Sequence, residues 1–144
     1  MKKLILFLLG FTPLVLGFLM NSWMMKNQSS ILPFNLIGIF SLAIWAFIGY
    51  KTYEVGKPLL ESAIIVNLPA FLALLLNLVQ EIILGRYWFN VFGVATQFFY
   101  LPLISLSSTF TFWSPYLWTV YIVGFIFMFV SYYMGGYFRR RSML

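Results

Sequence analysis

The chain has 144 residues, of which 62% are hydrophobic and 8% charged, and its mean hydropathy is +0.95. Soluble domains carry roughly a quarter charged residues, so this composition indicates a membrane protein. The net charge is +6, but Lys and Arg stand in short loops and at the termini, which predicts topology signals and contacts with anionic lipids rather than nucleic-acid binding. The chain has no Cys and no His, which argues against thiolate or imidazole metal sites and against the commonest nucleophile and base pairs. We therefore expect no cofactor, no metal and no catalytic residue.

The first two apolar segments, residues 4–20 and 31–50, are predicted to be membrane spans. The first follows Lys2 and Lys3, as a cleaved signal peptide would, but no small-residue cleavage site follows it and a proline interrupts it. We therefore expect an uncleaved span. Asn35 is a polar position of the second span, and we interpret it as part of a packing face.

The third segment, residues 59–84, is long enough to span but carries polar side chains at helical spacing. At about 100° per residue, its small and polar positions fall within one arc of the helix surface. These positions, here named the polar stripe, are Ala63, Asn67, Ala70, Leu74, Asn77 and Glu81. Such an arc predicts either a face for helix packing or one wall of a cavity open to the outer side.

Two interpretations of the polar stripe remain open. As packing, the amides of Asn67 and Asn77 bond to neighbouring helices, with Asn35, Ser41 and Ser131 as candidate partners, and Glu81 pairs with Arg86 at the outer end of the helix. As a site, Asn67, Asn77 and Glu81 bind a cation, a proton or a polar headgroup.

Secondary candidates lie elsewhere on the same segments. Glu61 falls on the opposite face of the third span, roughly 30 Å from Glu81, so the two carboxylates cannot act as one acid and base pair. Its expected neighbours are Lys57 and the first-turn amides of its own helix. Asn90 and Gln97 join the polar stripe only if the next segment crosses the membrane.

That next segment, residues 87–113, is aromatic and ambiguous, whereas residues 116–138 are a clear last span. With four spans, seven basic residues are cytoplasmic and only Lys26 and Arg86 lie outside; with five spans the split is four inside and five outside. The positive-inside rule favours four spans. The seven are Lys2, Lys3, Lys51, Lys57, Arg139, Arg140 and Arg141.

We therefore predict an all-α integral membrane protein of one domain, residues 1–144: a small four-helix transmembrane bundle, with five spans as the alternative. Residues 87–113 form an aromatic-rich interfacial or re-entrant segment between the last two spans. The compact loops and composition suggest a bacterial plasma membrane, with both termini cytoplasmic if there are four spans.

The predicted function is that of a non-enzymatic accessory, regulatory or partner-binding subunit of a larger membrane system, which contacts another membrane protein or itself through the aromatic segment. The alternative is an ion, proton or small-solute pathway lined by the polar stripe. A holin-like pore and an enzyme acting on a lipid-linked substrate are further alternatives, although an enzyme needs two convergent titratable groups and only Glu81 with Arg86 qualifies.

Overall fold

The computed structural model describes residues 2–56 and 58–143, and these residues form helices and connections without any strand. The helices are α1 (Lys2–Leu9), α2 (Thr12–Lys26), α3 (Phe34–Thr52), α4 (Leu59–Leu78) with its π-helical continuation η1 (Val79–Ile83), α5 (Val91–Tyr100), the 3₁₀ turn η2 (Leu101–Leu103), α6 (Ile104–Phe110) and α7 (Leu117–Arg141). Five stretches are long and apolar enough to cross a membrane: Lys2–Lys26, Phe34–Thr52, Leu59–Ile83, Val91–Phe110 and Leu117–Arg141. The all-helical prediction is confirmed, whereas the count of four is not.

The first stretch is longer than the expected span 4–20 and is broken between α1 and α2. Pro13 has no N–H to donate to the carbonyl oxygen of Leu9, four residues earlier. The Thr12 hydroxyl donates to that oxygen instead, at 2.7 Å. The break separates two packing partners, because α1 lies against α4 and α2 lies against α5.

The centre of the bundle is α4. Half of its apolar window is buried, compared with 17% for α3. The other elements direct large side chains towards it, and the resulting core contains Leu6, Trp45, Val66, Ala70, Phe99, Tyr100, Tyr121, Met128 and Tyr132. Helices α3 and α7 are also in close contact. If Gly49 were alanine, its Cβ would lie 2.1 Å from the Tyr132 carbonyl oxygen.

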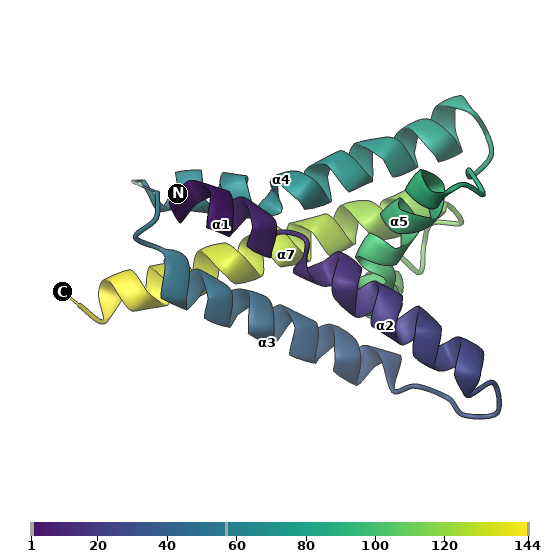
Figure 1. The fold of residues 1–144 in the computed structure, drawn as a ribbon, viewed down its shortest axis with the longest axis horizontal. Coiled ribbons are helices and arrows are strands. Elements are labelled where there is room, and N and C mark those ends of the chain that lie inside the picture. Colours follow the sequence, from purple (N-terminus) through teal and green to yellow (C-terminus); the bar gives the residue numbers. More distant parts are fainter. Residues whose placement is uncertain (1, 57, 144) are drawn as a thin grey trace.

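Both chain termini lie at one end of the bundle, which we call the termini end (Figure 1). There Lys3 forms an ion pair with Glu61 in the first turn of α4. The Tyr53 hydroxyl, just after α3, contacts Met143 Sδ at 3.2 Å near the C-terminus. At the opposite end, the far end, the last turn of α4 meets the first turn of α7.

The segment between α4 and α7 begins and ends at the far end. Gln80 Oε1 accepts a hydrogen bond from the Trp88 backbone N–H at 2.8 Å, and Glu81 Oε1 accepts one from the Leu117 backbone N–H at 3.0 Å. Two adjacent residues of η1 therefore hold both ends of this segment. Its helix is interrupted by η2 at Pro102, and the residues around that turn are buried in the core. Both ends of this segment, here named the α4–α7 segment, therefore lie at the same end of the bundle, and its middle is packed in the core.

Candidate functional site

The polar stripe of α4 faces the interior of the bundle. Ala63, Ala70 and Leu74 are buried, and so are Asn67 (1% exposed) and Asn77 (0% exposed). Only the last member of the stripe, at the end of the helix, is partly exposed. The spacing argument therefore identified the correct face of the helix.

Asn67 uses both ends of its amide within the protein. Its Oδ1 accepts a hydrogen bond from the indole Nε1 of Trp45 on α3 at 3.1 Å, and its Nδ2 donates to the Ala63 carbonyl at 2.9 Å. Trp45, rather than Asn35, Ser41 or Ser131, is the partner on a neighbouring helix, and the sequence carried a signal for it because a buried indole N–H needs an acceptor. Asn35 instead accepts a hydrogen bond from Ser105 at 2.8 Å.

A second group of amides meets α5 at the far end. Asn77 Nδ2 donates to the Thr96 carbonyl at 3.0 Å. Gln80, also 0% exposed, donates to Thr96 Oγ1 at 3.2 Å and to the Leu76 carbonyl at 3.1 Å. Gln80 was missing from the predicted site, although it follows Asn77 by three residues, a spacing that places both side chains on one face. Its Oε1 accepts a hydrogen bond from the Trp88 N–H at the start of the α4–α7 segment, so Gln80 joins three parts of the fold.

Glu81 is held by the two ends of the α4–α7 segment. Its carboxylate accepts hydrogen bonds from the Tyr87 hydroxyl and from the Leu117 N–H. The predicted pairing with Arg86 is wrong: among the described residues, no ion pair joins the two. Gly85 adopts a left-handed conformation, with φ of +62°, and closes a turn in which the Arg86 N–H donates to the Gln80 carbonyl at 3.0 Å. The Arg86 side chain is left exposed.

Tyr87 keeps its proton in this arrangement. Burial raises the pKa of its hydroxyl, and the hydrogen bond to Glu81 raises it further. The phenol therefore acts as a neutral donor to the carboxylate.

One atom of the cluster has no protein partner. Asn77 Oδ1 is buried and accepts no hydrogen bond from the described residues, and Ser107 Oγ on α6 is in the same condition. An amide oxygen and a carboxylate one helical turn apart are chemically suited to accept a proton donor or to contact a cation. Within residues 2–56 and 58–143, no group of three or more acidic, His or Cys side chains is placed to hold a metal ion.

The secondary candidates have local roles. Asn90 caps α5, because its Oδ1 accepts a hydrogen bond from the Gly93 N–H at 2.9 Å. Gln97 is half-buried on the same helix. Glu61 forms an ion pair with Lys3. The expected neighbour Lys57 lies outside the described residues.

Apolar side chains are exposed around the α4–α7 segment. A groove of about 540 Å³ runs between α2 and α5, here named the α2–α5 groove, and its lining residues include Val15, Phe18, Phe89, Val94 and Ala95. Large aromatic side chains are exposed next to the points where the segment begins and ends: Phe89, Phe92, Phe112, Trp113 and Tyr116.

The fold and site define a class of protein, an all-helical chain with five apolar stretches of membrane-spanning length around a buried cluster of amides. Comparison with protein-family models, with curated proteins and with solved structures finds no match to this chain. Any statement of activity must therefore come from the chain's own residues.

Proposed function

We propose that this chain is a multi-pass membrane protein with four spans and a re-entrant hairpin, and that both termini are cytoplasmic. The hydrogen bonds that Gln80 and Glu81 accept from Trp88 and Leu117 support this topology, because they keep both ends of the α5–α6 segment at the far end. Charge supports the orientation: seven of the nine Lys and Arg residues belong to the termini, to the last turn of α3 or to the α3–α4 connection. The broken helix at η2 is tolerated at membrane depth because protein surrounds it.

Single-cysteine labelling tests this topology, since the chain has no native Cys. Ser114→Cys lies in the α6–α7 connection, and Ser142→Cys follows α7. We expect an impermeant thiol reagent added to intact cells to label the first and not the second. Labelling of Ser142→Cys alone, or of both, would overturn the proposed topology.

The function we propose is that of a non-enzymatic partner-binding subunit, which seats an apolar transmembrane helix of another membrane protein in the α2–α5 groove. One observation carries this proposal: Phe89, 99% exposed, lines an apolar groove that none of the chain's described helices fills. A helix in that position would cover Phe89 and Val91 while gaining contacts with both walls.

Site-specific photocrosslinking in the native membrane tests this function. A photoreactive residue at Phe89 or Val91 should give one adduct of defined mass, whereas the same residue at Phe40, exposed on α3, should not. Ala95→Trp, which fills the groove, should abolish the adduct, and Ile39→Trp should leave it unchanged. An adduct of twice the chain's mass would indicate a second copy instead, and lipid adducts alone at all positions would contradict the proposal.

A pathway for ions or protons is the second candidate. Asn77 Oδ1 is buried and has no hydrogen-bond partner among the described residues, and Glu81 follows it by one turn, in the π-helical η1. Most of the stripe's other hydrogen-bonding capacity is used within the protein, which is why we place this function second. Under it, vesicles containing the chain show a flux that Glu81→Gln abolishes and Glu61→Gln does not. A chain that gives no flux above that of empty vesicles removes this candidate.

A further inference from the structure

A hollow at the termini end is formed by three parts of the chain that are far apart in sequence. Its volume is about 680 Å³. The start of α1, the α3–α4 connection and the end of α7 supply its walls: Lys2, Tyr53, Glu54, Gly56, Pro58, Leu59, Arg140 and Met143. The hollow, here named the terminal pocket, therefore exists only in the folded chain.

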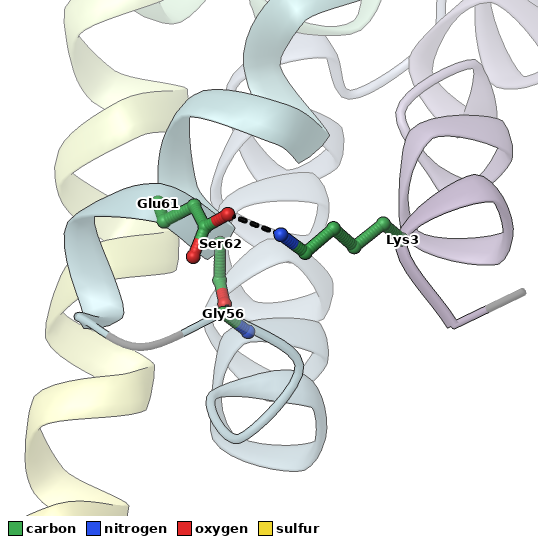
Figure 2. A network of polar contacts seen from close by, with 4 residues as sticks. All are labelled: Lys3, Gly56, Glu61 and Ser62. Carbon is green, nitrogen blue, oxygen red and sulfur yellow. Dashed lines mark hydrogen bonds and ion pairs between the residues drawn. The ribbon is translucent and has the colours of Figure 1, made fainter.

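Hydrogen bonds and an ion pair fix the walls of the terminal pocket. Figure 2 shows the Lys3 side chain reaching from α1 to the Glu61 carboxylate on α4, next to the point where the Gly56 N–H donates to Ser62 Oγ at 2.7 Å. Ser62 is completely buried, so the connection is tied to a fixed part of α4. The Tyr53 hydroxyl contacts Met143, which ties the same connection to the C-terminal end.

Three cationic side chains of the termini end already have partners within the protein. Lys3 is paired with Glu61, and Lys51 lies 5.5 Å from the centre of the Phe47 ring. Arg139 donates to the Tyr50 hydroxyl at 3.0 Å and covers its ring. These three groups are therefore engaged by the protein itself.

Lys2 and Arg140 differ from them in two ways. Both line the terminal pocket, and within residues 2–56 and 58–143 neither side chain takes part in a hydrogen bond or ion pair. The one acidic residue of the pocket, Glu54, accepts a hydrogen bond from Tyr53. Two cations and one carboxylate line the pocket, so its potential is positive. Guanidinium and ammonium groups are the side chains that bind phosphate.

We propose that the terminal pocket binds the phosphate group of an anionic phospholipid of the adjacent leaflet, held between Lys2 and Arg140. A lipid fits better than a soluble phosphate, because Pro58, Leu59 and Met143 give the pocket an apolar wall where the apolar helices end. This inference rests on the membrane placement proposed above but not on the partner-binding function.

The experiment compares two double variants that lose the same charge. Lys2→Gln/Arg140→Gln removes the two pocket cations, and Lys51→Gln/Arg141→Gln removes two cations of the same end that do not line the pocket. Each protein is reconstituted in nanodiscs of phosphatidylglycerol and phosphatidylcholine, extracted into mild detergent, and its bound lipid is measured by native mass spectrometry. We expect the pocket variant to retain roughly tenfold less phosphatidylglycerol than wild type, as the loss of charge-assisted contacts implies, and the control variant to match wild type.

Three results would overturn the inference. These are an equal loss in both double variants, which indicates surface charge alone; wild type without enrichment of phosphatidylglycerol over phosphatidylcholine; and displacement of the lipid by inorganic phosphate, which indicates a soluble ligand. Lys2→Arg/Arg140→Lys, which keeps both positive charges, should retain the binding of phosphatidylglycerol. Thermal unfolding of each variant identifies any that fails to fold. The cysteine-labelling experiment reports separately on membrane topology, so failure of that proposal and failure of this one are distinguishable.

Discussion

The contact between α3 and α7 leaves no room for a methyl group at Gly135. A Cβ there would lie 1.9 Å from the Ala46 carbonyl oxygen, and real Cβ contacts essentially never fall below 3.0 Å. The α7 backbone fixes the position of this Cβ, and the carbonyl oxygen belongs to the α3 backbone, so neither atom can rotate away. The two helices must therefore separate by about 1 Å. We expect Gly135→Ala to lower the free energy of unfolding by about 3 kcal/mol, the upper part of the range for overpacked interiors.

Gly124→Ala on the same helix is the matched control. Its Cβ would meet Ser107 Oγ and the Tyr100 ring at 3.2 Å, and side chains can shift by the few tenths of an ångström required. Alanine favours the helix over glycine by up to about 1 kcal/mol at both positions, so that effect cancels in the comparison. Thermal or denaturant unfolding in detergent measures both variants, and equal stability of Gly135→Ala and Gly124→Ala would refute the close approach of α3 and α7.

Three further changes test the buried polar groups. Trp45→Phe should cost about 1–2 kcal/mol of unfolding free energy by leaving Asn67 Oδ1 without its interhelical donor, and adding Asn67→Leu should recover part of that loss; an additive double variant would contradict the contact. Ser107→Ala should be neutral or stabilising, because the buried hydroxyl has no protein partner, whereas a clear loss of stability would indicate that it bonds a group other than protein. The pKa of Tyr87 is raised from its ordinary value of 10.0, so its contribution to stability is complete below pH 10 and is lost as pH rises above it. Tyr87→Phe should therefore reduce the loss of stability between neutral and strongly alkaline pH, measured against wild type, and an unchanged alkaline profile would argue against the bond to Glu81.

The sequence predicted the buried face of α4 because helical periodicity is a local property. Asn67 and Asn77 lie where a spacing of three and four residues requires. Their partners were not predictable in the same way, since Trp45 and Thr96 are brought to them by the packing of other helices. The expected pairing of Glu81 with Arg86 failed because proximity in sequence was taken for proximity in space, and the turn at Gly85 separates them.

Residues 87–113 show the same limit. Apolar length and composition identify a helical segment of membrane-spanning length, and they cannot say on which side of the bundle it ends. That is decided by Gln80 and Glu81, whose hydrogen bonds to Trp88 and Leu117 hold both ends of the segment at the far end.

Composition and periodicity by themselves determined that this chain is helical, that its helices are apolar enough for a membrane, and which face of α4 is inward, because each depends only on residues one or two turns apart. Tertiary structure alone decided which polar groups meet, where the apolar groove lies, and that Lys2 and Arg140, from opposite ends of the chain, line one pocket. Such contacts join residues far apart in sequence, and only the packing of whole helices brings them together.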